Sequence, residues 1–199
     1  MPRVSSYPED LRDRLVRAAA ERLVQAPPDQ LSLRELAASQ DTSTNAIYSL
    51  FGGKDALIRA VVADANESFL AEQEKALEFG ATIEGLMELG RRYRAWALDQ
   101  PSLYQLMFGG VGTLASIPCY GIGPLEQMVS ALVEAGVLRA APVRSIGHAL
   151  WAASHGFVLI EMGLQIDREI GDEQFREFQE LFLQGLLASS EEHALAASV

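Results

Sequence analysis

The chain has 199 residues, of which 49% are hydrophobic and 22% are charged, so it has enough apolar side chains for one or two folded domains and is not a disordered polymer. Neither of its two longest charge-free stretches is typical of a membrane span, since the longer one is broken by prolines and glycines. The first residues show no apolar signal segment, and the single cysteine, Cys119, excludes an intramolecular disulfide framework. We therefore expect a cytoplasmic protein.

The net charge of −11 is unevenly distributed along the chain. Residues 1–60 hold eight basic and eight acidic side chains, whereas residues 61–199 hold eight basic and nineteen acidic ones. All of the excess negative charge thus lies in the second part. A neutral N-terminal module can meet a polyanion such as DNA while an acidic body stays clear of it.

Helical periodicity dominates the whole sequence and predicts an all-α fold. Ser6 and Glu9 have the spacing of a capping box, in which each side chain satisfies the other residue's backbone N–H. The helix that they announce has an apolar residue at every fourth position from Leu11 to Leu23, and two prolines at 27 and 28 end it.

Two short helices are predicted next. Ser32 caps the first of them, which ends near Ser39. The turn is predicted at residues 40–41, and either Thr42 or Ser43 caps the second short helix. That helix ends at the glycine pair 52–53, because glycine readily takes a left-handed cap conformation.

The rest of the chain is predicted as further helices around one irregular loop. The expected helices cover residues 54–79, 82–96, 125–135, 143–162 and 173–188, with a short aromatic segment at 102–108. Five glycines and two prolines between residues 109 and 124 predict a loop there.

The strongest functional pattern is the span 31–57, in which two short helices follow a longer one. This is the order of a helix-turn-helix domain, whose second helix enters the major groove of DNA. Small polar side chains at the start of that helix are suited to base edges and phosphates, and a lysine beside the next helix N-terminus is suited to a phosphate. The candidate DNA contacts are Ser32, Thr42, Ser43, Thr44, Asn45, Tyr48, Ser49 and Lys54. The alternative is an ordinary capped and solvated surface.

The residues in this span resemble the DNA-binding signature of the tetracycline-repressor-like (TetR) family. The resemblance covers about the first 60 residues and is carried by Leu-Ala at 36–37, Ala-Ile-Tyr at 46–48, Phe51, Lys-Asp at 54–55 and Leu57. The second part is similar to one C-terminal subfamily, through YRAWA at 93–97, PSLYQLMF at 101–108, and Trp151 with the His-Gly pair at 155–156.

The resemblance implies an all-α homodimer that has a ligand pocket in its C-terminal domain and leaves operator DNA when the ligand binds. Two departures limit what it implies. Asp41 stands where the family usually has glycine in the turn, and aspartate takes a left-handed conformation less readily than glycine. Asn45 and Ser49 occupy variable positions of the family pattern, so no operator sequence follows from it.

A cluster of large side chains in the second part predicts an apolar ligand cavity between helices. The candidate ligand contacts are Tyr93, Trp96, Tyr104, Met107, Phe108, Met128, Trp151 and His155. For each residue, an ordinary place in the core is the alternative. We expect no metal site, since the histidines are not accompanied by a metal-binding motif or by clustered carboxylates.

The last two predicted helices have more apolar surface than one protomer needs and predict a four-helix interface between two copies. The candidate interface residues are Phe175, Phe178, Phe182 and Leu186. A larger core within one chain is the alternative.

Together these patterns predict a helix-turn-helix DNA-binding domain over residues 1–53 and a ligand-binding and dimerisation domain over residues 54–199. The expected partners are a pseudo-palindromic double-stranded operator, a small-molecule effector and a second copy of the chain, with no cofactor, no metal and no membrane. The protein is predicted to be a regulator and not an enzyme. The alternative is a helical module that regulates a protein partner without contacting DNA.

Overall fold

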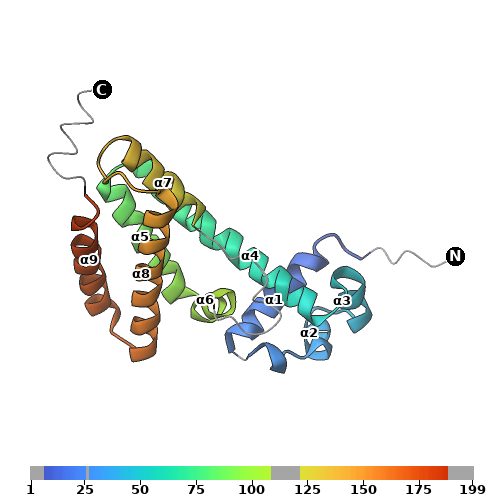
Figure 1. The fold of residues 1–199 in the computed structure, drawn as a ribbon. Coiled ribbons are helices and arrows are strands. Elements are labelled where there is room, and N and C mark those ends of the chain that lie inside the picture. The colour runs from blue at the N-terminus through green and yellow to red at the C-terminus, as the bar shows by residue number, and fades with distance from the viewer. Residues whose placement is uncertain (1–6, 26, 109–121, 188–199) are drawn as a thin grey trace. The chain divides into compact units, whose positions relative to one another are not determined.

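The computed structural model describes residues 7–25, 27–108 and 122–187, and all regular secondary structure within them is helical (Figure 1). The all-α prediction is therefore confirmed. Within the same residues, no helix combines the length and the apolar composition that crossing a membrane requires. The α-helices are α1 (Leu11–Gln25), α2 (Leu33–Ser39), α3 (Thr44–Phe51), α4 (Lys54–Glu74), α5 (Ile83–Asp99), α6 (Pro101–Phe108), α7 (Gly123–Glu134), α8 (Val143–Leu164) and α9 (Arg168–Gln184).

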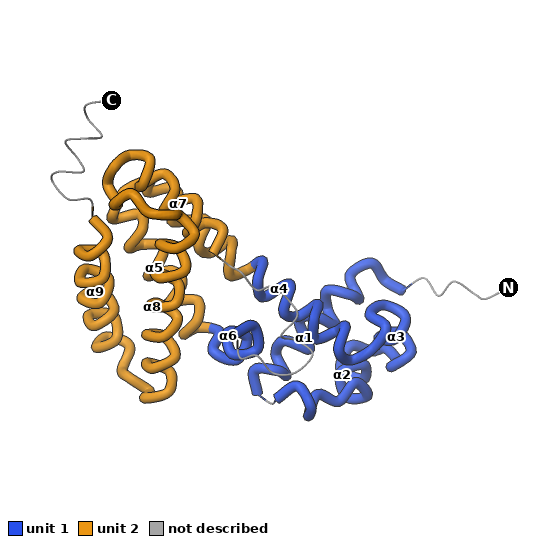
Figure 2. The backbone as a smooth tube through the Cα atoms, viewed as in Figure 1, with its two compact units in different colours: residues 1–67, 100–119 blue, residues 68–99, 120–199 orange. Residues whose placement is uncertain are grey.

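The chain forms two compact units, shown in different colours in Figure 2. Unit 1 contains residues 1–67 and 100–119, and unit 2 contains residues 68–99 and 120–199. These units do not coincide with the predicted ranges 1–53 and 54–199. Helix α4 contributes to both units, and α6 packs against α1 within unit 1, where Leu103 and Leu106 contact the core.

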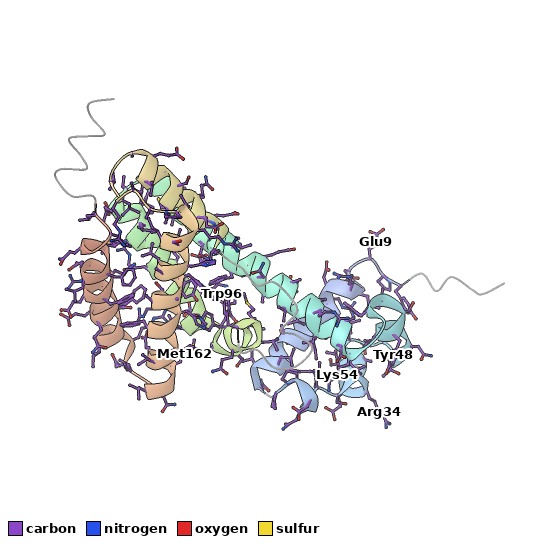
Figure 3. The ribbon with its side chains drawn as sticks, in the orientation of Figure 1. Glu9, Arg34, Tyr48, Lys54, Trp96 and Met162 are labelled. Atoms are coloured by element: carbon purple, nitrogen blue, oxygen red, sulfur yellow. The ribbon has the colours of Figure 1, made fainter. Side chains whose placement is uncertain are left out.

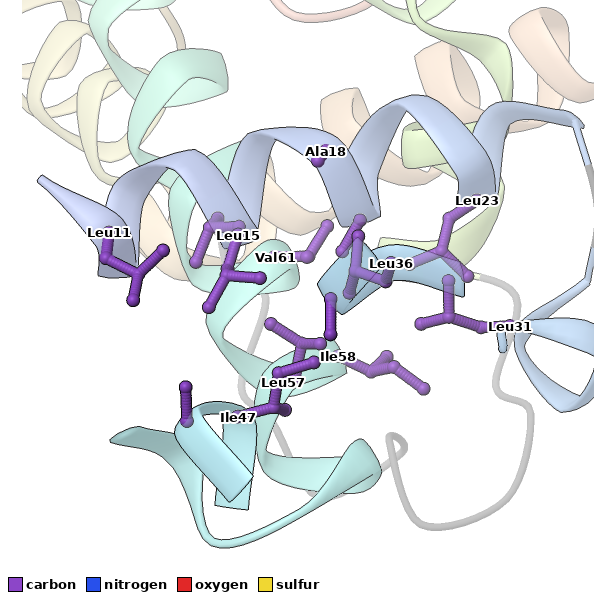
Figure 4. Packing of buried hydrophobic residues seen from close by; sticks show 14 residues of the cluster. Leu11, Leu15, Ala18, Leu23, Leu31, Leu36, Ile47, Leu57, Ile58 and Val61 are labelled. Atoms are coloured by element: carbon purple, nitrogen blue, oxygen red, sulfur yellow. The ribbon is translucent and has the colours of Figure 1, made fainter. Parts of the chain in front are cut away.

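The apolar stripe of α1 forms one wall of the core of unit 1 (Figure 4). Leu15 and Ala19 are fully buried there, and α2, α3 and α4 close the core with Leu36, Ile47 and Leu57. Burial of one such leucine contributes about 2 kcal/mol to folding. The core therefore holds α2 and α3 in a fixed arrangement on α1.

The predicted caps of the short helices are only partly confirmed. Ser32 caps α2, and its Oγ accepts a hydrogen bond from the Glu35 N–H at 3.3 Å. Ser43 occupies the cap position of α3, but its side chain makes no capping hydrogen bond. Gly52 ends α3 at φ +85°, as predicted. Ser6 lies outside the described residues.

The turn between α2 and α3 places an aspartate in the left-handed region. Asp41 has φ +51°. The Thr42 N–H donates to the Ala37 carbonyl at 3.0 Å, the hydrogen bond of a Schellman cap at the end of α2. Asp41 therefore takes the conformation for which glycine is the usual residue.

Replacement of Asp41 by alanine is expected to destabilise the protein by about 1 kcal/mol, because a Cβ without a local polar partner is disfavoured at positive φ. Asp41→Gly is expected to retain or raise the stability. Urea denaturation followed by circular dichroism measures both effects. Asp64→Ala, at an exposed position within α4, is the matched control. Equal stability of Asp41→Ala and the wild type would contradict the expected strain.

Unit 2 differs from the prediction at several helix ends. The predicted helix 54–79 is α4 followed by a 3₁₀ helix (Lys75–Phe79), and Gly80 ends it at φ +69°. Helix α8 passes through Gly163 and ends at Leu164, with Gln165 at φ +52°. The cap forms at Gln165 because the Ile166 N–H bonds back to the Glu161 carbonyl at 3.2 Å.

Helix α9 corrects the prediction at both ends, since it starts at Arg168 and ends at Gln184. Its N-cap is Asp167, whose side chain accepts from the Glu169 N–H at 3.0 Å. The first turn of α9 buries no large apolar side chain, since its isoleucine, Ile170, is 53% exposed, so hydrophobic periodicity alone did not reveal it. Helix α7 begins at Gly123, which is earlier than predicted.

A buried ion pair joins three helices of unit 2. Arg94 of α5 and Glu161 of α8 are 5% and 2% exposed, and Arg94 Nε donates to Glu161 Oε2 at 2.7 Å. Arg94 also donates to Asp172 of α9. Burial works to lower the pKa of Arg94, but its hydrogen bonds to Glu161 and Asp172 outweigh that effect and leave the pKa above its usual value.

Gly171 allows α9 to approach this ion pair. A Cβ on Gly171 would overlap the Glu161 carboxylate and the Arg94 guanidinium. The first turn of α9 can therefore lie against the charges only because residue 171 has no side chain. This close approach completes the three-helix contact.

Candidate functional site

One face of α3 is buried and the other is polar and exposed. Ala46 and Ile47 are fully buried against the core of unit 1. Since side chains three and four positions apart share a helix face, the opposite face is left to solvent. Ser43, Asn45, Tyr48 and Ser49 are exposed there, whereas Thr42 and Thr44 are half-buried.

Tyr48 is the largest exposed side chain of this face. It is 56% exposed, and Figure 3 shows it on α3. A Cβ added to Gly53 would lie 3.8 Å from Tyr48 Cε1, so the ring passes close to the backbone at residue 53. The exposed part of the ring can contact a ligand.

Lys54 is the first residue of α4, where free backbone N–H groups and the helix dipole favour an anion. Its ammonium donates to the backbone carbonyl of Asp29 at 2.8 Å. The carbonyl holds the side chain in place without neutralising its charge. This geometry is suited to a phosphate, because a lysine ammonium has three donors and the carbonyl uses one of them.

The other cations of unit 1 differ in what they contact. Arg14 donates to the Gln40 carbonyl at 2.8 Å, Arg22 pairs with Glu35 at 3.8 Å, and Arg12 lies over the Phe51 ring. These three arginines of α1 contact α2, the residue after it, or α3, and so help to hold the helices of unit 1 together.

Arg34, in contrast, is exposed in the first turn of α2 and extends outward from it (Figure 3). The candidate contacts predicted from the sequence did not include it. Its position two residues after the Ser32 cap was the available signal. Ser32 itself is half-buried, and its hydroxyl oxygen is engaged in the cap.

Unit 2 contains a small apolar cavity. Its volume is about 30 Å³, which is room for about one or two water molecules. No charged side chain is part of its lining among the described residues. The lining residues come from α4, α5, α7, α8 and α9 and the residue before α7: Gln73, Leu86, Leu89, Gly90, Tyr93, Ile122, Leu125, Leu150, Trp151, Ser154, Phe178, Gln179, Phe182 and Leu183.

The structure brings only part of the predicted ligand set to this cavity. Tyr93 and Trp151 line it. His155 does not line the cavity but contacts both of them, since its ring stacks on Trp151 at 5.5 Å and its Nδ1 is 3.1 Å from the Tyr93 hydroxyl. Burial lowers the pKa of His155, which favours the neutral form of its ring.

The other predicted ligand residues lie elsewhere. Trp96 is buried, with Nε1 donating to Ser68 Oγ at 3.2 Å, and Met128 is buried in the main core of unit 2. Tyr104, Met107 and Phe108 belong to α6 and hence to unit 1. The structure therefore separates a set that the sequence pattern had grouped together.

The predicted interface residues also divide into two kinds. Phe175 and Leu186 are buried within unit 2, whereas Phe178 and Phe182 are half-buried and line the cavity. The more exposed apolar side chains of α8 and α9 are Leu159, Ile160, Leu164, Ile170 and Leu181.

The part of the chain that the structure describes holds no cluster of side chains suited to a metal ion.

Two family models match the sequence. Residues 15–61 match the model for bacterial regulatory proteins of the tetR family, and residues 86–182 match the tetracyclin repressor-like C-terminal domain. Together they cover more than two thirds of the chain. The chain belongs to the TetR family. Its helix-turn-helix and C-terminal domains are those of a TetR-family transcriptional regulator, and members of this family are regulators and not enzymes.

Solved structures share the fold of this chain. A protein of unknown function from Rhodococcus sp. RHA1 has a TM-score of 0.78 and 23% identity, over 94% of this chain and 100% of the other. The TetR-family regulator PfmR from Thermus thermophilus has a TM-score of 0.65 and 22% identity, over 86% of this chain and 98% of the other.

A third structure, described as the molecular basis for control of antibiotic production by bacterial hormones, has a TM-score of 0.72 and 25% identity, over 92% of this chain and 100% of the other. No curated protein matches the sequence significantly.

Proposed function

We propose that this TetR-family chain is a repressor that binds a pseudo-palindromic operator as a homodimer and is released by a small, mainly apolar effector. The exposed polar face of α3, beside Lys54 at the start of α4, carries the proposal. A protein that reads chromosomal DNA acts in the cytoplasm of a bacterium. The operator is expected to contain two half-sites separated by about one or more turns of the duplex.

The side chains on and beside the exposed polar face of α3, called here the reading face, have two proposed roles. Asn45 and Thr44 reach base edges in the major groove, where an amide or a hydroxyl distinguishes base pairs. Tyr48, Lys54 and Arg34 contact phosphates, which position the helix without reading sequence. The remaining candidates, Ser32, Thr42, Ser43 and Ser49, are polar groups at the edges of the same surface.

Helix α8 offers the proposed dimer surface. Ile160 and Leu164 are 60% and 71% exposed, and small residues such as Ala152 and Gly156 precede them on the helix. Pairing of two copies would remove these apolar side chains from water. Phe175 and Leu186 support the same helices from inside the protomer.

Ile160→Glu is expected to convert the dimer to monomers, because an unpaired carboxylate in an apolar interface costs several kcal/mol. Operator affinity is expected to fall with it, since each monomer then reads only one half-site. Light scattering and a gel shift measure the two effects. Val24→Glu, at an exposed apolar position of unit 1, is the control. An intact Ile160→Glu dimer would place the interface elsewhere.

The effector is proposed to act through α4, the helix that contributes residues to both units. The similar structure described as the molecular basis for control of antibiotic production by bacterial hormones supports a chemical signal for a chain of this fold. Coupling is reciprocal, so operator DNA must weaken effector binding by the same factor by which the effector weakens DNA binding.

The decisive experiment is selection of bound fragments from a genomic DNA pool, followed by a gel shift with the enriched sequence. A palindromic enriched motif and salt-sensitive binding would support the proposal. No enrichment over a pool without protein would overturn DNA binding and leave the protein-interaction alternative. A compound screen with the operator complex then tests release.

A further inference from the structure

Gln179 is a buried amide in the wall of the unit 2 cavity. It is 7% exposed, and its Nε2 donates to the Met87 carbonyl of α5 at 2.9 Å. Its Oε1 is buried and has no hydrogen-bond partner among the residues that the structure describes. A buried acceptor of this kind is costly to leave unsatisfied and calls for a donor.

The orientation of this amide is set by its surroundings. A carbonyl accepts from Nε2 but would repel Oε1, so the contact with Met87 prevents the amide from turning over. Gly90 provides the space, because a Cβ there would overlap Nε2 of Gln179. The orientation of the amide is thus fixed, and Oε1 remains available as a hydrogen-bond acceptor.

The rest of the lining indicates a neutral ligand. Apart from Gln179, the lining side chains that carry an oxygen are Gln73, Tyr93 and Ser154, and the lining contains no Asp, Glu, Lys, Arg or His among the residues described. An anion or a cation that entered the cavity would find no opposite charge among the described lining residues. Its desolvation cost would therefore be large. The aromatic and aliphatic lining favours an apolar body.

We infer that the effector is a neutral, mainly apolar molecule with one hydroxyl or amide N–H group, and that this group donates to Gln179 Oε1. The inference rests on the proposed ligand-responsive function. Because the cavity holds only about 30 Å³, the ligand must widen it. Phe178 and Phe182 are only half-buried in the wall, so we expect these rings to shift when the ligand enters.

Three probes with the same naphthalene ring system test the inference by calorimetry on the full chain: 1-naphthol, 1-fluoronaphthalene and 1-naphthoate. The first carries a donor, the second replaces it by a fluorine that cannot donate, and the third is an anion. Naphthol is expected to bind about tenfold more tightly than fluoronaphthalene. Naphthoate is expected to bind more weakly than either.

Gln179→Met keeps the length of the side chain and removes the acceptor. It is expected to abolish the difference between naphthol and fluoronaphthalene. Gln174→Met, at an exposed position of the same helix, is expected to retain the difference. Thermal unfolding of both variants shows whether they are folded.

Equal binding of naphthol and fluoronaphthalene to the wild type would overturn the role of Gln179, whether or not the variant folds. Tighter binding of naphthoate would overturn the neutral class. Failure of all probes to bind would show that the cavity takes no apolar body. A gel shift with the selected operator keeps these results separate from the proposed function, since intact DNA binding would leave only the ligand class in error.

Discussion

Replacement of Tyr48 by alanine is expected to lower operator affinity by about tenfold to a hundredfold, because the dimer loses two equivalent contacts beside the reading helix. Lys54→Ala is expected to weaken binding to all sequences. It should also reduce the slope of log K against log salt by about two, one phosphate contact for each subunit. Gel shifts at several salt concentrations measure both effects.

Asn45→Ala is expected to act differently, since a base-reading side chain sets preference at one position in each half-site. Repeated selection from a random pool would reveal relaxed specificity there. Lys75→Ala removes an exposed lysine of unit 2 and is the charge-matched control for Lys54→Ala. If Tyr48, Lys54 and Asn45 variants all bind the operator as the wild type does, the reading helix is not α3.

Arg94→Met is expected to destabilise unit 2 by about 3–5 kcal/mol, because it leaves the Glu161 carboxylate buried without its partner. Such a loss is a large fraction of the stability of an ordinary domain. Chemical denaturation measures the change. Arg168→Met, which removes an exposed ion pair with Asp99, is the control and is expected to have little effect.

The double variant Arg94→Met, Glu161→Gln distinguishes loss of a favourable pair from exposure of an unpaired charge. Its stability is expected to recover much of the loss, since no buried charge remains. A double variant as unstable as Arg94→Met alone would indicate that the packing of the arginine, and not the charge of Glu161, is decisive.

Local signals predicted unit 1 well. Ser32, Gly52 and the proline pair after α1 act within a few residues, so spacing in the sequence revealed them. The exposed polar face of α3 followed because burial of Ala46 and Ile47 determines the exposed side of a short helix.

Long-range features were harder to predict. Aromatic side chains suit a core and a cavity equally well, so the sequence could not separate Trp151 in the cavity wall from Trp96 in the core. The placement of α6 against α1 depends on Leu103 and Leu106 meeting residues far away in the chain. The pairing of Arg94 with Glu161, 67 positions apart, carries no local signal.

Helix α4 contains neither glycine nor proline along its 21 residues, so it has none of the usual sites for a kink. It is about 30 Å long and relates the residues at its two ends by a fixed phase. One residue inserted at the boundary between residues 67 and 68 would rotate everything beyond it by about 100°, whereas seven residues, about two turns, would nearly restore the original angle. The effector response proposed for this chain should thus vary with inserted length at the period of the α-helix.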